Sequence, residues 1–214
     1  METTFEAVIL ANGTFPTHAV PLDILHHAAH LIACDGAFTP LLLGGVGGGS
    51  LGGVGGGCLE EVVVIGDGDS LPAAFHDRLI RIDEQDDNDL TKATRYCLQR
   101  GWHRIAYLGC TGKREDHTLG NISLLMRYFR DMQVDAVMFT DHGFFTPVFG
   151  HHTFTSRPGQ QVSIFNFGCT KLTSEGLKWN SYAYSQLWQG TLNEAVGNSF
   201  SFCADGYYLV FQTY

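Results

Sequence analysis

Residues 105–129 read IAYLGCTGKREDHTLGNISLLMRYF, and this stretch decides how the chain folds. The apolar run at 105–108 predicts a short buried strand, and residues 119–129 have the spacing of an amphipathic helix. A loop that contains Gly109 and Gly112 joins the strand to the helix. A strand, a turn and a helix in this order form the repeating unit of a parallel α/β sheet.

The same unit recurs upstream as short apolar runs and helical patterns. Strands are predicted at residues 7–10, 31–34, 62–65 and 79–82. Helices are predicted at residues 21–30 and 89–100, the second followed by a glycine that favours a helix end. We therefore expect an N-terminal α/β domain with a mostly parallel open sheet.

The pattern changes after about residue 134, where aromatic and β-branched runs alternate with Gly, Pro and Asn. Such runs lie at residues 149–155, 161–167, 200–204 and 207–214. They predict a smaller antiparallel β domain. We expect residues 1–145 to form the α/β domain and residues 146–214 the β domain.

Residues 44–59 interrupt the α/β pattern with the repeat GGVGGGSL–GGVGGGCL. A stretch so rich in glycine loses much entropy on ordering and has little to bury, so it predicts a flexible loop. Gly47, Gly49 and Gly52 form a G-x-G-x-x-G pattern. Because glycines continue where a helix would have to follow, we interpret the pattern as low complexity and not as a dinucleotide site.

Composition narrows the class of protein. The net charge is −9 and the longest basic run is Lys113-Arg114, which argues against a nucleic-acid partner. An acidic enzyme still binds a nucleotide when a divalent metal neutralises the phosphates. Neither a signal peptide nor a bilayer-spanning run is visible, and the cysteines are widely spaced, so we expect a cytoplasmic protein with reduced thiols and no membrane partner.

Acidic turns follow the predicted strands. They lie at residues 35–36, 66–70, 86–89 and 115–116. Ligands of open α/β sheets bind at the carboxyl ends of the strands, so these turns should converge on one crevice. Carboxylates gathered in one place need a cation, and hard oxygen ligands suit Mg²⁺. The turns therefore predict a magnesium site.

The loop at residues 109–117 predicts a phosphate site beside these acids. Gly109 and Gly112 let backbone amides approach a phosphate, and a helix starting near Thr118 presents unpaired N–H groups to an anion. Arg114 can bind phosphate oxygens bidentately. The loop lacks the Walker A spacing, so it is not a P-loop.

The ordered motifs resemble those of the thiamine pyrophosphokinase (thiamine diphosphokinase) family. They are VILANG at 8–13, CDGA at 34–37, GDGDS at 66–70, NDLTKA at 88–93, the loop at 111–117 with Asn121, and LTSEGLKW at 172–179. Their order and approximate spacing hold over nearly the whole chain. The resemblance implies an N-terminal α/β catalytic domain and a C-terminal β-sandwich-like domain.

The resemblance also implies an activity and its residues. Members move the terminal diphosphate of ATP onto the hydroxyl of thiamine, release AMP, and work as homodimers with active sites at the interface. The implied catalytic residues are Asp67, Asp69, Asp89, Arg114 and Asp116, of which Asp67, Asp69 and Asp89 would bind Mg²⁺. The implied ATP-binding residues are Asn12, Asp35, Ser70, Gln85, Lys92, Thr111, Gly112, His117 and Asn121. The implied thiamine-binding residues are Trp179, Thr191 and Asn193.

Some alternatives stay open at this point. Either Asp69 or Asp116 could orient or deprotonate the alcohol. The chain could also be a non-catalytic thiamine or nucleotide binder of the same fold, or a kinase for another small alcohol that would release ADP.

Overall fold

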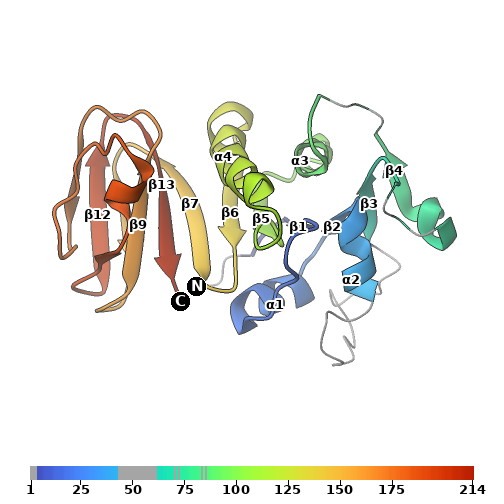
Figure 1. Ribbon diagram of the computed structural model, residues 1–214, viewed down its shortest axis with the longest axis horizontal. Helices are drawn as coiled ribbons and strands as arrows, with labels where there is room; N and C mark the ends of the chain where they lie inside the picture. The colour runs from blue at the N-terminus through green and yellow to red at the C-terminus, as the bar shows by residue number, and fades with distance from the viewer. Residues whose placement is uncertain (1–3, 43–61, 70, 72, 83, 85) are drawn as a thin grey trace. The chain divides into compact units, whose positions relative to one another are not determined.

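The computed structural model describes residues 4–42, 62–69, 71, 73–82, 84 and 86–214 (Figure 1). The glycine-rich stretch predicted as a flexible loop lies outside the described residues, as do Ser70 and Gln85. The chain divides into two compact units, Met1–Asp141 and His142–Tyr214. The division falls before the expected domain boundary because an antiparallel strand of the second unit already begins at Gly143.

The first unit contains a parallel sheet. Its strands are β1 (Ala7–Leu10), β2 (Leu31–Cys34), β3 (Val63–Gly66), β4 (Leu79–Arg81), β5 (Arg104–Leu108) and β6 (Asp135–Phe139). They lie in the order β6-β5-β1-β2-β3-β4, and every neighbouring pair is parallel. The predicted mostly parallel α/β fold is confirmed. Strand β6 was not predicted.

The helices of the first unit are α1 (Ala19–His26), α2 (Phe38–Leu42), α3 (Asp89–Gln99) and α4 (Glu115–Met132), with 3-10 turns at Asp35–Ala37 and Ala73–Arg78. Helix α4 begins earlier than expected, at Glu115 and not near Thr118. Glu115 and Asp116 occupy its first turn, where acidic side chains stabilise the positive end of a helix. No helix within the described part of the chain has the length and apolarity to cross a membrane.

Buried tyrosines of the first unit fix α3 and α4 over the sheet. Tyr107 of β5 stacks on Tyr128 of α4 with ring centroids 5.5 Å apart. Their hydroxyls pair with Thr94 at 3.1 Å and Thr91 at 2.7 Å, both on α3. Because these buried polar groups are satisfied, they join three elements at low cost. Helices α3 and α4 accordingly pack side by side (Figure 1).

The second unit is a pair of antiparallel sheets. One contains β11 (Asn193–Glu194), β9 (Gln161–Asn166), β13 (Tyr207–Thr213) and β7 (Gly143–Phe149), and the other contains β10 (Leu172–Glu175), β12 (Ser199–Ala204) and β8 (His152–Thr155). Side chains from both sheets share one apolar core, which includes Ile164, Phe202 and Tyr208. The predicted antiparallel, sandwich-like second unit is confirmed.

The predicted strand at 149–155 is wrong as a single element. Strand β7 ends at Phe149 and β8 begins at His152, and the two belong to different sheets. Gly150 turns the chain with a φ of 73°. Glycine adopts this left-handed conformation without steric cost. A glycine within an apolar run therefore indicates a break between two strands.

Candidate active site

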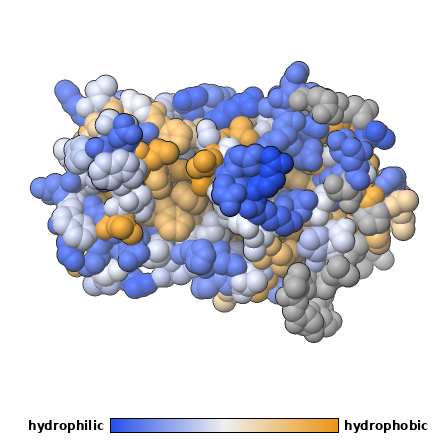
Figure 2. Space-filling view, viewed as in Figure 1, coloured by the Kyte–Doolittle hydropathy of each residue, from blue (hydrophilic) through white to orange (hydrophobic). Residues whose placement is uncertain are grey.

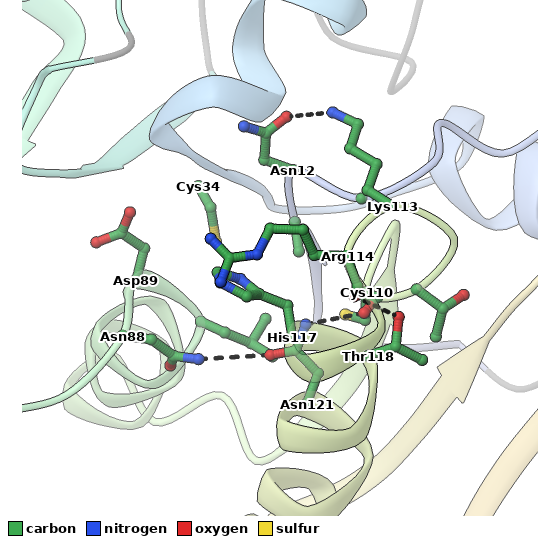
Figure 3. Close-up of a pocket in the computed structure, with 14 residues that line it drawn as sticks. Asn12, Cys34, Asn88, Asp89, Cys110, Lys113, Arg114, His117, Thr118 and Asn121 are labelled. Atoms are coloured by element: carbon green, nitrogen blue, oxygen red, sulfur yellow. Dashed lines mark hydrogen bonds between the residues drawn. The ribbon is translucent and has the colours of Figure 1, made fainter.

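A cavity of about 370 Å³ opens at the carboxyl ends of β1, β2 and β5 (Figure 3). The loop after β5 and the starts of α3 and α4 complete its wall. The lining residues are Ala11, Asn12, Gly13, Cys34, Asn88, Asp89, Leu90, Cys110, Thr111, Lys113, Arg114, His117, Thr118 and Asn121. This is the edge of the sheet where the sequence predicted a ligand site.

Glycines allow the loop after β5 to lie against the loop after β1. The N–H of Gly13 donates to the Gly109 carbonyl at 2.6 Å, and the N–H of Thr14 donates to the Thr111 carbonyl at 2.8 Å. Gly109 and Gly112 have φ values of 63° and 89°. A Cβ atom at Gly109 would lie 2.5 Å from the Ala11 carbonyl oxygen. The backbone path of this loop therefore requires glycine.

Asn88 organises the start of α3. Its Oδ1 accepts hydrogen bonds from the N–H and the hydroxyl of Thr91, each at 3.0 Å, which caps the helix. Its Nδ2 donates to Oδ1 of Asn121 on α4 at 3.4 Å, and Nδ2 of Asn121 donates to the Cys110 carbonyl at 2.8 Å. The acid Asp89 follows the cap directly, so this chain of hydrogen bonds fixes it relative to the loop.

Asp89 sits in an environment that favours a nearby cation. Its burial raises the pKa of the carboxyl group, Lys92 opposes that shift, and the charges of Asp67 and Asp35 add to it. The Nζ atom of Lys92 lies 3.4 Å from Oδ1 of Asp89, and the Lys92 side chain is only 4% exposed. A half-buried carboxylate beside other carboxylates gains stability when a cation binds.

The charged groups at the start of α4 lie at the exposed mouth of the site. Arg114 donates to Asp116 from Nη2 at 2.6 Å and from Nε at 3.1 Å. These bonds lower the pKa of Asp116 to about 2, which makes it a weak base at neutral pH. Lys113 donates from Nζ to Oδ1 of Asn12 at 2.9 Å (Figure 3).

The acidic turn after β3 lies outside the lining of the cavity. Asp35 is buried, and its Oδ2 accepts a hydrogen bond from the N–H of Gly68 at 3.1 Å. Oδ1 of Asp67 accepts from the N–H of Asp69 at 3.1 Å. Asp67 is half-buried and Asp69 is exposed. Asp35 therefore holds the turn, while the other two carboxylates face more open surroundings.

The cavity brings together only part of the predicted set. Of the predicted catalytic and ATP-binding residues, it is lined by Asn12, Asp89, Thr111, Arg114, His117 and Asn121. The described residues of that set that do not line it are Asp35, Asp67, Asp69, Lys92, Gly112 and Asp116. Sequence reasoning gave no role to Asn88, Lys113 and Thr118. The capping pattern of Asn88 before Asp89 was a readable signal.

The predicted metal ligands do not form a ready-made cluster. Among the residues described by the structure, no group of three or more His, Cys, Asp or Glu side chains is arranged to hold a metal ion. Mg²⁺ usually binds through one or two carboxylates together with substrate phosphates and water. The half-buried carboxylate of Asp89 at the cavity wall fits that mode of binding.

The residues predicted to bind thiamine lie in the second unit. Trp179 is 53% exposed, whereas Asn193 is buried at 3%. The exposed Thr191 donates its hydroxyl to the Trp188 carbonyl at 2.7 Å. Trp179 and Asn193 contact each other through hydrogen bonds between the Asn193 side chain and the Trp179 backbone.

Fold and pocket define a class of protein: an α/β enzyme whose cavity joins a carboxylate to a basic, glycine-shaped loop, as phosphate-transferring enzymes do. Residues 22–138 match the thiamin pyrophosphokinase catalytic domain, and residues 143–211 match the substrate-binding domain of thiamin pyrophosphokinase. Because the first match covers more than half of the sequence, the chain belongs to the thiamin pyrophosphokinase family.

Solved structures share the fold at low sequence identity. The thiamine pyrophosphokinase from Bacillus subtilis is 19% identical, with a TM-score of 0.71 over 97% of this chain and 98% of that one. The yeast thiamin pyrophosphokinase is 14% identical, with a TM-score of 0.77 over 100% and 88%. The Candida albicans protein is 14% identical, with a TM-score of 0.75 over 97% and 89%. No curated protein matches the sequence.

Family membership makes the chain a transferase that synthesises thiamine diphosphate by pyrophosphate transfer from ATP. The family and the activity predicted from the motifs are both confirmed at this level.

Proposed function

We propose that the cavity of the first unit binds ATP and that its residues carry out the transfer of the terminal diphosphate to thiamine, leaving AMP. The observation that carries this proposal is the cavity lining, which includes both the carboxylate of Asp89 and the basic residues Lys113 and Arg114 (Figure 3). In phosphoryl-type transfer, positioning and charge neutralisation matter more than covalent chemistry. The cavity supplies both.

The loop after β5 and the start of α4 would bind the phosphates. Helix α4 has eighteen residues and begins at Glu115, so its positive end lies at the cavity. Gly112 turns the loop with a left-handed backbone that leaves Thr111 and Lys113 on the cavity wall. Arg114 would leave Asp116 and bind phosphate oxygens, for which its planar guanidinium is suited.

Mg²⁺ would be held by Asp89 together with Asp67 and Asp69. The bound ion would neutralise charge on the phosphate oxygens of ATP. The buried Lys92 lies beside Asp89 and opposes the desolvation that raises the pKa of that carboxyl group. Asp35 would act on this set by holding the turn that carries Asp67. Asn121 would hold the loop through the Cys110 carbonyl.

Asp69 and Asp116 are the two candidates for the group that orients or deprotonates the thiamine hydroxyl. While Arg114 is paired with Asp116 it lowers the pKa of that carboxyl group to about 2, so Asp116 would become a better base only when Arg114 moves to the phosphates. Asp69 is exposed and makes no ion pair in the described part of the chain. Ser70 and Gln85 keep their predicted place in the ATP site as expectations.

The second unit would bind thiamine, with the exposed ring of Trp179 stacking on a thiamine ring beside Thr191 and Asn193. We also propose a homodimer with active sites at its interface. Large exposed apolar side chains support a contact surface on this unit, and Figure 2 shows apolar residues on its surface. They include Leu187, Trp188, Leu192 and Val196. Sedimentation of the purified protein would show a dimer, and a monomer at working concentration would contradict this proposal.

We further propose that the protein works in the cytoplasm. Cys34, Cys97, Cys110 and Cys169 are free and buried, as expected of thiols in a reducing compartment.

The proposal is tested by incubating purified protein with ATP, Mg²⁺ and thiamine and separating the nucleotides by chromatography. AMP should accumulate together with thiamine diphosphate, and only when both metal and thiamine are present. Production of ADP would indicate a kinase for another small alcohol. Thiamine binding without loss of ATP would indicate a non-catalytic binder.

A matched pair of variants tests the assignment of the loop. Arg114→Ala should lower kcat by roughly 10²-fold, because a cation that offsets charge in the transition state is lost. Arg130→Ala is the control, since Arg130 lies in the last turn of α4, at the opposite end of the helix from Arg114, and pairs with Asp131 at 2.8 Å. Equal activity in the two variants would contradict the role of Arg114.

A further inference from the structure

Residues 177–179 run antiparallel to the chain at β11 and pair with it over a short stretch. Leu177 and Ala195 form a bridge, and the N–H of Lys178 donates to the Glu194 carbonyl at 2.9 Å. The backbone pairing stops there. Beyond it, the polar backbone groups of Trp179 find their partner in a side chain.

That side chain is Asn193, which binds the Trp179 backbone at two points. Its Oδ1 accepts from the N–H of Trp179 at 3.2 Å, and its Nδ2 donates to the Trp179 carbonyl at 2.8 Å. Oδ1 also accepts from the N–H of Glu194 at 2.8 Å. The carboxamide thus binds both polar groups of the Trp179 backbone, which the alternation of an antiparallel ladder turns away from the partner strand. Asn193 is 3% exposed, so its polar atoms serve the protein.

Leu192 gives this arrangement its backbone turn. Its φ is 65°, in the left-handed region that side chains larger than glycine seldom occupy. The Leu192 side chain is 71% exposed, so apolar packing does not compensate for the strained backbone. Strain of this kind persists where the surroundings impose it, and it is often found at functional sites. Here the turn directly precedes Asn193. We call the buried Asn193 side chain the Trp179 clamp, because it binds the Trp179 backbone.

The clamp leaves the Trp179 ring available. The indole is 53% exposed, and the Lys178 ammonium lies 4.8 Å from the ring centroid. Lys178 is in turn paired with Glu194 at 3.5 Å. Contacts within the chain therefore hold the backbone of Trp179 and cover part of its ring, while the rest of the ring faces solvent.

We propose that Asn193 is a positioning residue that acts through Trp179 and does not touch thiamine. It fixes the backbone from which the indole projects, and the left-handed turn at Leu192 places it there. This inference rests on the proposed stacking of thiamine on Trp179. An aromatic platform that is already ordered binds its ligand more tightly, because less entropy is lost on binding.

The first test follows the ring itself and needs no turnover. The chain has three tryptophans, so Trp102→Phe with Trp188→Phe leaves Trp179 as the only tryptophan, which is excited at wavelengths that tyrosine does not absorb. In that background Asn193→Ala should lower the fluorescence anisotropy of Trp179 and raise its quenching by acrylamide. Asn193→Asp keeps an acceptor for the Trp179 N–H but loses the donor to its carbonyl, and should give an intermediate change. Unchanged anisotropy in folded Asn193→Ala protein would overturn the proposal.

The second test separates positioning from general loss of structure. Asn193→Ala should raise the KM for thiamine roughly five- to tenfold and leave the KM for ATP unchanged, because two hydrogen bonds that hold the platform are lost. A parallel loss of ATP affinity, or an unchanged KM for thiamine, would overturn the proposal. Wild-type protein that consumes no ATP would instead refute the proposed function, and the anisotropy would then decide on the clamp alone.

The third test concerns the turn. Leu192→Gly fits a left-handed backbone and should keep the Trp179 anisotropy, whereas the β-branched Leu192→Ile fits it poorly and should lower the anisotropy. Gln133→Gly is the control, because Gln133 is also left-handed, with a φ of 58°, but ends α4 in the first unit. It should leave the Trp179 signal unchanged. A loss in Leu192→Gly as large as in Leu192→Ile would show that the leucine side chain matters, and would overturn the role of the turn.

Discussion

The proposed ATP-binding cavity of the first unit and the Trp179 region of the second unit position their side chains by different means. In the cavity, backbone geometry dominates: Gly109 and Gly112 take left-handed conformations, and the starts of α3 and α4 point at the ligand space. Around Trp179, the buried side chain of Asn193 binds the backbone of a residue whose ring is exposed. The first region is positioned by loops and helix starts at the edge of the parallel sheet. The second is positioned by the side-chain amide of one residue, Asn193.

This difference determines how each region should respond to mutation. A change in the cavity alters charge or backbone path where we propose that phosphates bind, so it should affect turnover strongly. A change at the Trp179 clamp alters the order of a surface platform, so it should affect thiamine affinity and little else. The following predictions test that contrast, from the largest expected effect to the smallest.

Asp89→Asn should produce the largest effect. Removing the only half-buried carboxylate on the described cavity wall should lower kcat by roughly 10²- to 10³-fold, since charge stabilisation is lost in the transition state. The circular dichroism spectrum should stay unchanged because asparagine keeps the size of the side chain. Asp131→Asn, at the exposed end of α4, is the control and should turn over normally. Near-wild-type turnover of Asp89→Asn would contradict the proposed role of Asp89 in the cavity.

Gly112→Ala and Gly101→Ala separate backbone strain from function. Both glycines are left-handed, at 89° and 80°, so each alanine should cost about 1–2 kcal/mol of unfolding free energy. A Cβ at Gly112 would also meet Thr14, at 2.8 Å from its Cβ, whereas Gly101 has open space. We expect the KM for ATP to rise about tenfold or more in Gly112→Ala only. Equal kinetics in both variants would show that the loop path is unimportant.

Asn88→Ala should have a smaller effect, on stability more than on chemistry. Loss of the α3 cap should cost about 1 kcal/mol in urea unfolding, and Asn88→Ser should restore most of it, because serine also caps helices well. Both variants lose the bond to Asn121. If serine restores stability but the KM for ATP stays raised, that bond is what aligns the loop with Asp89. Full recovery of both would assign Asn88 to capping alone.

The smallest effect is expected at Asp205 of the second unit. Hydrogen bonds from the Thr170 side chain and the Lys171 N–H lower its pKa to about 2. Since the pKa is lower in the folded state than in the unfolded state, the stability that this carboxylate adds is present above about pH 4 and is lost as the pH falls toward about 2. The urea midpoints of wild type and Asp205→Asn should therefore differ at neutral pH and converge in acid. A gap that widens in acid would reverse the sign of this argument.

The strands that the sequence pattern predicts differ in their burial and pairing from the elements that it does not predict. Strands such as β1 and β2 are continuous buried apolar runs, and the sequence pattern shows them directly. Strand β10 has the sequence LTSE, in which only alternate residues are buried or half-buried. At Gly150 the chain passes from one sheet to the other within a run of apolar residues. These features depend on tertiary pairing and not on local propensity.

The candidate site divides in the same way. Strand-end acids and the glycine loop were readable because sheet topology brings them to one edge. The Arg114–Asp116 pair and the Asn193 clamp were not, because they depend on which rotamer a side chain adopts and on a left-handed residue at Leu192. The thiamine-binding role of the second unit's residues stays a prediction, and the burial of Asn193 supports our proposal that this residue supports the site and does not contact the ligand.

The measurement that tests the central claim most directly follows the β-phosphorus of ATP. Purified protein is given ATP labelled at the β position, with Mg²⁺ and thiamine, and the products are separated. Transfer of the terminal diphosphate predicts that the label appears in thiamine diphosphate while the AMP is unlabelled. Label recovered in ADP would contradict the account, because it would show that only the terminal phosphate is moved.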